Sequence, residues 1–129
     1  MSTFKLDHID HVALTVRDVK RSVAWYKEVL GLERRYEEAW GDYPAVVGAG
    51  ETSLALFPCE SPNPKPRPDH DTIAMRHVAF AMDRANFQQA QARFQELGIE
   101  FDFEDHTICH SIYISDPDGH QLEVTTYDI

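Results

Sequence analysis

The stretch HVALTV at residues 11–16 recurs as HVAFAM at residues 77–82, and this pair decides the fold. In both copies, bulky apolar side chains alternate with small or polar ones, and a period of two residues predicts β-strands. The apolar face of each strand is expected to pack in a core. The opposite face begins with His11 or His77 and has the character of a polar cavity wall. The chain is therefore expected to consist of two similar halves.

Each of these strands is followed by the pattern of an amphipathic helix. Asp18 and Asp83 are the expected N-caps, and Gly31 and Gly98 are the expected stops. The buried faces are expected to comprise Val19, Val23, Tyr26 and Leu30 in the first helix, and Phe87, Ala90, Phe94 and Leu97 in the second. A helix of this kind needs a sheet to cover, which the rest of each half is expected to supply.

Three short strands are predicted to follow each helix. Their ranges are about 32–39, 44–49 and 52–57 in the first half, and 100–105, 109–115 and 120–127 in the second. The segment Asp116-Pro117-Asp118-Gly119 predicts a tight turn between the last two. We therefore predict an α+β fold of two tandem βαβββ modules whose mixed sheets form a barrel-like cavity.

The first module is predicted to span residues 6–58 and the second residues 73–128, both approximately, within a single domain of residues 1–129. Five of the seven prolines lie in residues 58–68. Alternating prolines prevent helix formation and strand pairing, so we interpret residues 58–72 as an extended Pro-rich linker. A Pro-rich ligand for a peptide-binding domain is the less favoured alternative.

Composition restricts the classes of function. The chain has 129 residues, 43% of them hydrophobic, which suffices for a real core. With 22 acidic and 12 basic residues the net charge is −10, so a nucleic-acid partner is not expected. Neither an apolar stretch of about 20 residues nor a signal region is legible, so no membrane association and a cytoplasmic location are expected. Cys59 and Cys109 are lone thiols, expected to be reduced.

Three side chains form a candidate metal site. Laying the last strand of one half over that of the other places Glu123 where the first half has Ala55. A single strand histidine is more often structural than a ligand, but His11 and His77 occur in register and Glu123 joins them on the polar face. Two imidazoles and one carboxylate are the ligand set of a facial triad, which favours Fe(II), with Mn, Zn, Ni or Co as alternatives.

Residues 9–33, IDHVALTVRDVKRSVAWYKEVLGLE, and residues 111–128, SIYISDPDGHQLEVTTYD, resemble the vicinal oxygen chelate superfamily. Its members include glyoxalase I, extradiol dioxygenases, fosfomycin-resistance thiol transferases and bleomycin-resistance proteins. The resemblance implies a metal held at the positions of His11, Ala55, His77 and Glu123. Alanine cannot bind a metal, so the pattern is the three-ligand one of dioxygenases and fosfomycin-resistance enzymes. The resemblance also implies a homodimer and a small-molecule substrate.

A finer resemblance is to the extradiol dioxygenase signature. It rests on Tyr113-x-x-Asp116-Pro117-x-Gly119-x-x-x-Glu123, preceded by His106, and it departs at Glu104, where the signature has a small or aliphatic residue. The familiar ring-cleaving enzymes have four modules, whereas this chain has two. The resemblance implies that His106 transfers protons and that Tyr113 binds substrate oxygens. His110 is an alternative base.

These observations favour an extradiol-type ring-cleaving dioxygenase acting on a small, catechol-like substrate. The first alternative is a glyoxalase-type lyase or isomerase, or a thiol transferase. The second is a metal-free binding protein that sequesters a drug or metabolite, which would not need two inward histidines and a carboxylate. The sequence contains no legible glutathione motif. No basic pocket for a phosphonate stands out either, and Arg76 and Lys65 are the residues that could supply one.

Overall fold

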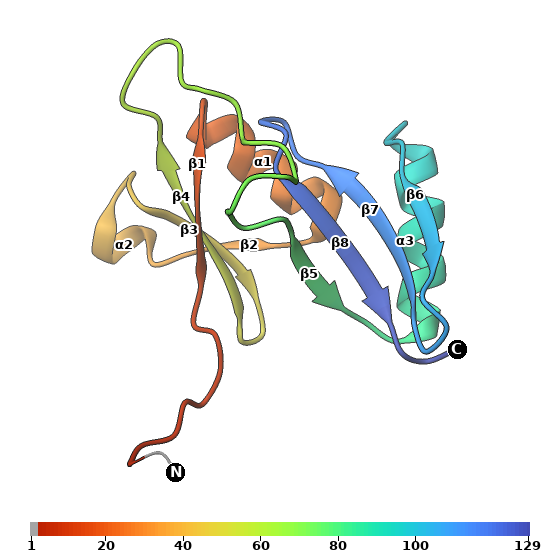
Figure 1. Cartoon of the computed structure of the whole chain (residues 1–129). Helices are drawn as coiled ribbons and strands as arrows, with labels where there is room; N and C mark the ends of the chain where they lie inside the picture. Colours follow the sequence, from red (N-terminus) through yellow and green to blue (C-terminus); the bar gives the residue numbers. More distant parts are fainter. Residues whose placement is uncertain (1–2) are drawn as a thin grey trace. The chain divides into compact units, whose positions relative to one another are not determined.

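The computed structural model describes residues 3–129, and the chain divides into two compact units, Met1–Pro64 and Lys65–Ile129 (Figure 1). Each unit has a four-stranded mixed sheet and a helix of at least twelve residues, in the order β-α-β-β-β. The prediction of an α+β fold with a doubled βαβββ unit is therefore confirmed. In residues 3–129, both sheets are open and end on edge strands, so neither closes into a barrel by itself.

The first unit has one element that the sequence did not predict. Its elements are β1 (Val12–Val16), α1 (Val19–Leu30), β2 (Glu33–Arg35), α2 (Glu37–Trp40), β3 (Ala45–Ala49) and β4 (Thr52–Pro58). The sheet order is β1-β4-β3-β2, with β1 parallel to β4 and the other pairs antiparallel. The strand predicted at 32–39 ends at Arg35, because Tyr36 adopts a φ of 61° and the chain then turns into α2.

The second unit repeats this topology without the extra helix. Its elements are β5 (Val78–Ala81), α3 (Arg84–Glu96), β6 (Asp102–Asp105), β7 (His110–Ser115) and β8 (Gln121–Thr126). The sheet order is β5-β8-β7-β6, and β5 is parallel to β8. The predicted turn joins β7 to β8: the Gly119 N–H donates to the Asp116 carbonyl at 3.0 Å, and Gly119 has a φ of 90°. Glycine adopts this φ without steric cost.

Strand register confirms the internal repeat. In the first unit Ala13 pairs with Ala55, and in the second Ala79 pairs with Glu123. Ala55 and Glu123 therefore occupy equivalent places in their own sheets. His11 and His77 are equivalent in the same sense, since each directly precedes the edge strand that is parallel to the last strand of its unit.

The predicted helix N-caps are confirmed, as is Gly31 at the end of α1, whereas the C-cap of α3 is Leu97, directly before Gly98. The Asp18 side chain accepts from the Arg21 N–H at 3.0 Å, and the Asp83 side chain accepts from the Asn86 N–H at 2.8 Å. The buried faces differ in part from those predicted: α1 buries Val19, Ser22, Tyr26 and Val29, and α3 buries Phe87 and Phe94. In α1, Ser22 and Val29 are buried in place of the predicted Val23 and Leu30, which are half-buried.

Both cysteines, Cys59 and Cys109, are free thiols, as predicted. None of the helices within residues 3–129 combines the length and the apolar character that a membrane crossing requires.

Candidate metal and substrate site

His77 and Glu123 lie side by side in the second unit. His77 Nε2 is 2.9 Å from Glu123 Oε1. Two ligands bound at right angles to one divalent ion, each at ~2.1 Å, are separated by about 3 Å. The Glu123 residue is 8% exposed, and a buried carboxylate requires a cationic or hydrogen-bonding partner. The spacing and the donor types therefore fit two neighbouring ligands of a divalent metal.

The second oxygen of this carboxylate is held by a buried hydroxyl. Ser111 Oγ donates to Glu123 Oε2 at 2.6 Å and lies 2.9 Å from Thr125 Oγ1. The β7–β8 register places Ser111 opposite Thr125, two positions along the strands from the pair of Tyr113 and Glu123. The hydrogen bond to Oε2 orients the carboxylate so that Oε1 faces His77. Outer hydrogen bonds of this kind commonly fix the orientation of a metal ligand.

Ser111 was not among the residues predicted from the sequence. Its signal was the strand alternation itself, because a residue two positions before Tyr113 lies on the same face of the strand.

Tyr113 and His106 form a second pair beside the first. His106 Nε2 is 2.9 Å from the Tyr113 hydroxyl, and the Tyr113 ring makes an edge contact with His77 at 5.9 Å between centroids. Burial raises the pKa of Tyr113, and the negative charges of Glu123 and Glu104 raise it further. The phenol therefore keeps its proton well above neutral pH and is available as a hydrogen-bond donor.

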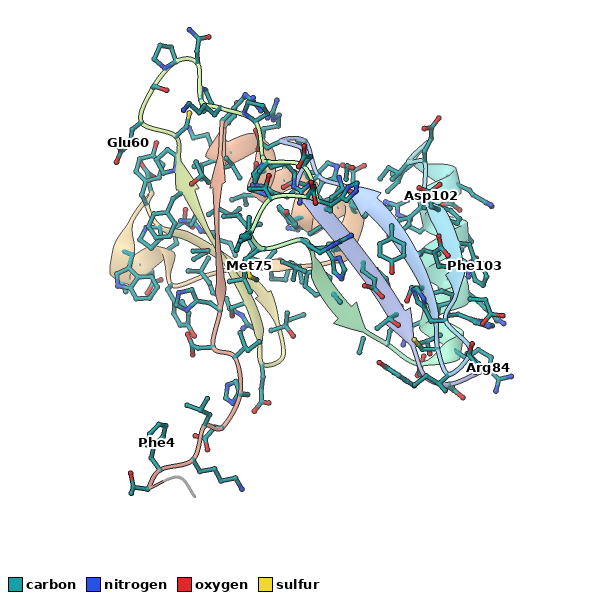
Figure 2. All side chains as sticks on the ribbon, viewed as in Figure 1. Phe4, Glu60, Met75, Arg84, Asp102 and Phe103 are labelled. Atoms are coloured by element: carbon teal, nitrogen blue, oxygen red, sulfur yellow. The ribbon has the colours of Figure 1, made fainter. Side chains whose placement is uncertain are left out.

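His110 lies in different surroundings from His106. Its Nε2 is 3.7 Å from Asp105 Oδ1, and its ring lies 5.2 Å from that of Phe103, which Figure 2 labels on β6. His110 is on β7, three residues before Tyr113, so strand alternation directs the two side chains to opposite faces. The structure thus brings His106, but not His110, to Tyr113.

A cavity of about 530 Å³ opens beside these side chains within the second unit. Volumes of this size are typical of small-molecule sites. Its lining residues are Arg67, His70, Arg76, His77, Glu104, His106, Tyr113 and Gln121. Two of them, Arg67 and His70, come from residues 58–72, which were predicted to be only a linker. A Pro-rich stretch carries no periodic signal that would aim its side chains at a site.

His11 belongs to the first unit. Its Nδ1 is 2.9 Å from Asp10 Oδ2, and its side chain is 51% exposed. A carboxylate on one ring nitrogen orients the imidazole and leaves the other nitrogen for a metal. Within residues 3–129, no three His, Cys, Asp or Glu side chains are gathered into one group able to hold a metal ion. The observed donor set is therefore the pair His77 and Glu123.

The doubled βαβββ architecture with two open mixed sheets defines the vicinal oxygen chelate class of fold. Residues 8–124 match the Glyoxalase/Bleomycin resistance protein/Dioxygenase superfamily, and the chain belongs to that family. The resemblance noted in the sequence is thereby confirmed.

Relatives within the family carry different activities. The chain is 30% identical over 118 residues to catechol-2,3-dioxygenase of Bacillus subtilis (strain 168), covering 91% of this chain but only 40% of that protein. It is 28% identical over 119 residues to glutathione transferase FosA of Serratia marcescens, covering 92% of this chain and 80% of that protein. A crystal structure of lactoylglutathione lyase from Agrobacterium tumefaciens superposes with a TM-score of 0.72 at 27% identity, over 94% of both chains. The relatives thus span dioxygenase, transferase and lyase chemistry.

Proposed function

We propose that the protein is a divalent-metal-dependent, extradiol-type dioxygenase that cleaves the ring of a small catechol-like molecule. One observation carries the proposal. The His77–Glu123 pair, 2.9 Å apart, lies beside a second pair, His106 and Tyr113, also 2.9 Å apart. A ligand pair next to an imidazole–phenol pair supplies both a place for two substrate oxygens and a group that exchanges their protons.

The proposed ligands are His11, His77 and Glu123, and the favoured metal is Fe(II), with Mn, Zn, Ni or Co as alternatives. A metal bound there would supply the Lewis acidity that favours a deprotonated diol. Asp10 and Ser111 orient their ligand side chains through the hydrogen bonds described above.

His106 and Tyr113 are the proposed catalytic residues. An imidazole nitrogen can accept a proton and release it again, so His106 is suited to take a hydroxyl proton from the diol at Nε2 and return it later. Tyr113 keeps its own proton because its pKa is raised, so it donates a hydrogen bond to a substrate oxygen. His110 is the less favoured base because it contacts Asp105 and Phe103 instead of Tyr113.

A thiol transferase acting on a phosphonate is the second candidate. Two observations favour it: the chain spans 80% of the transferase relative but 40% of the dioxygenase relative, and two arginines line the cavity. A lyase of the glyoxalase kind remains a further alternative. Sequestration without a metal is less favoured, because such a pocket has no need of the buried Glu123 carboxylate beside an imidazole.

The proposal extends to assembly and location. β1 and β5 are edge strands of their sheets, and edge strands tend to be covered by another chain, so we propose a homodimer. The two free thiols fit a reducing compartment such as the cytoplasm. Sedimentation equilibrium tests the dimer directly, and a monomer at micromolar concentration would contradict it.

Metal analysis of protein purified without added metal is the decisive test. We expect stoichiometric Fe or Mn in the parent protein and loss of that metal in His77→Ala. Anaerobically iron-loaded protein should then consume O2 with a catechol. Bound Zn or Ni, with thiol transfer to fosfomycin and no O2 uptake, would replace the dioxygenase by the transferase. Metal-free protein that binds a small molecule unchanged would support sequestration.

A further inference from the structure

We propose that Arg67 and Arg76 form an anion subsite in the cavity of the second unit, which binds a carboxylate or phosphonate group on the substrate. The substrate would then carry an anionic group in addition to its vicinal oxygens. The inference rests on the proposed function only for the binding of the vicinal oxygens at the metal. The anion subsite does not depend on it, because the two arginines line the cavity whether or not a metal binds.

The two arginines differ from several other basic side chains of this acidic chain, which have carboxylate partners. Arg93 pairs with Glu96 at 3.2 Å, and Arg84 pairs with Asp128 at 3.4 Å. Over residues 3–129, neither Arg67 nor Arg76 has a carboxylate within ion-pair distance, although the chain has 22 acidic residues and a net charge of −10. Guanidinium groups left without a carboxylate, and facing a cavity, are available for an anionic ligand.

A backbone hydrogen bond holds the first of these guanidinium groups in place. Arg67 Nη2 donates to the backbone carbonyl of Arg76 at 2.7 Å, and Arg67 is half-buried. This bond ties the end of the Pro-rich segment to the residue that directly precedes His77. A guanidinium has five N–H donors, so one bond to a carbonyl leaves most of them for a ligand.

The charge of the lining favours an anion. Apart from the histidines, the charged residues that line the cavity are Arg67, Arg76 and Glu104. Glu104 offsets one of the two positive charges. The Glu123 carboxylate is already engaged by His77 and Ser111. His70, also in the lining, adds a further nitrogen donor.

The arrangement therefore fits a substrate that has vicinal oxygens at one end and an anionic group at the other. Arginine binds carboxylate and phosphonate groups through paired N–H donors, and such charge-assisted hydrogen bonds are among the strongest in proteins. A cavity of about 530 Å³ has room for an aromatic ring or short chain between the two ends. The oxyanion could belong to an aromatic carboxylic acid or to a phosphonate, and binding experiments separate these sources.

Isothermal titration calorimetry on metal-free protein is the test, because it requires no turnover. The probes are 3,4-dihydroxybenzoate, its neutral counterpart catechol, and methylphosphonate. We expect 3,4-dihydroxybenzoate or methylphosphonate to bind more tightly than catechol, and more weakly as salt is raised. Loss of a charge-assisted hydrogen bond in Arg67→Gln or Arg76→Gln should weaken that binding about tenfold or more.

Two control variants make the result specific. Arg93→Gln removes the same charge from α3, outside the cavity lining, and should change binding less than about twofold, since remote surface charges are screened. Arg76→Lys keeps the charge and should retain part of the affinity, because lysine lacks the paired donors. Preference for 3,4-dihydroxybenzoate over methylphosphonate identifies a carboxylate substrate, and the reverse preference identifies a phosphonate.

Equal binding of catechol and both anions, or equal affinities in the parent, Arg67→Gln and Arg76→Gln proteins, would overturn the subsite. Its failure is distinguishable from failure of the proposed function. Anion binding that depends on both arginines, in a protein that consumes no O2, would refute ring cleavage and leave the subsite standing. If the protein consumes O2 with neutral catechol, and neither arginine variant changes the rate, ring cleavage stands and the subsite is refuted.

Discussion

Replacing Ser111 by alanine should cost stability, because it removes a hydroxyl donor from one oxygen of a buried carboxylate. Ser111 is fully buried, and its hydroxyl donates to Glu123 Oε2 at 2.6 Å. The Glu123 side chain is 11% exposed, so water cannot readily replace the lost hydroxyl. A hydrogen bond to a charged group contributes about 1.5–3 kcal/mol. We expect the free energy of unfolding of Ser111→Ala to fall by about that amount.

A second buried serine provides the matched control. Ser22 on α1 is also fully buried, but its Oγ has no hydrogen-bond partner within residues 3–129. Ser22→Ala makes the same chemical change, removes an unpaired hydroxyl and places a better helix former in α1. Its free energy of unfolding should be unchanged or higher.

Urea unfolding of metal-free protein, followed by circular dichroism, measures both values. Metal titration of the same proteins adds a second readout: Ser111→Ala should bind the metal about 10- to 100-fold more weakly, because the ligand carboxylate loses its orientation. If both serine variants lose equal stability, the hydrogen bond to Glu123 is not what Ser111 contributes. If Ser111→Ala is destabilised but binds metal as the parent does, Glu123 is a structural residue and not a ligand.

The other predictions concern the proposed catalytic base His106, the close backbone contact at Gly48 and the pH dependence of the contact between Arg84 and Asp128. His106→Ala should lower the rate of O2 uptake with a catechol by about a hundredfold or more, whereas His110→Ala should retain activity; the reverse order would exchange their roles. Gly48→Ala should lower the free energy of unfolding by about 1–3 kcal/mol in urea, because a Cβ there would meet the Thr52 carbonyl at 2.5 Å and Arg35 Nη1 at 2.7 Å. An unchanged denaturation midpoint would show that β3 shifts freely. Hydrogen bonds from Arg84 hold the pKa of Asp128 below its usual value, so the carboxylate stabilises the fold above that usual pKa, and the effect disappears as pH falls through the lowered one. The melting temperature of Asp128→Asn should therefore be lower than that of the parent at neutral pH and equal to it in strong acid. A difference in melting temperature that does not change with pH would contradict this reasoning.

Local patterns in the sequence determined the repeated unit. The alternation in HVALTV and HVAFAM, together with Asp18 and Asp83 as caps, predicted strands and helices that the structure has in the same order. The overlay of Ala55 on Glu123 anticipated their equivalent register. Such patterns involve residues that are close in sequence, so they can be interpreted without knowledge of the rest of the fold. The strand expected at 32–39 is present as β2, but its predicted end was wrong, because that end depends on the positive φ of Tyr36, which no periodicity indicates.

Only the tertiary structure showed which of the two candidate bases lies beside Tyr113 and brought the cavity wall together. His106 and His110 are four residues apart, and His106 lies in the turn between β6 and β7, where Thr107 has a φ of 76°, yet its Nε2 is 2.9 Å from the Tyr113 hydroxyl. Ser111 and Glu123 meet through the hairpin register, while Arg67 and Arg76 meet through a backbone hydrogen bond across a loop. Strand periodicity assigns a side chain to a face, but contacts between distant residues depend on how strands pair and loops close, which a single sequence does not specify.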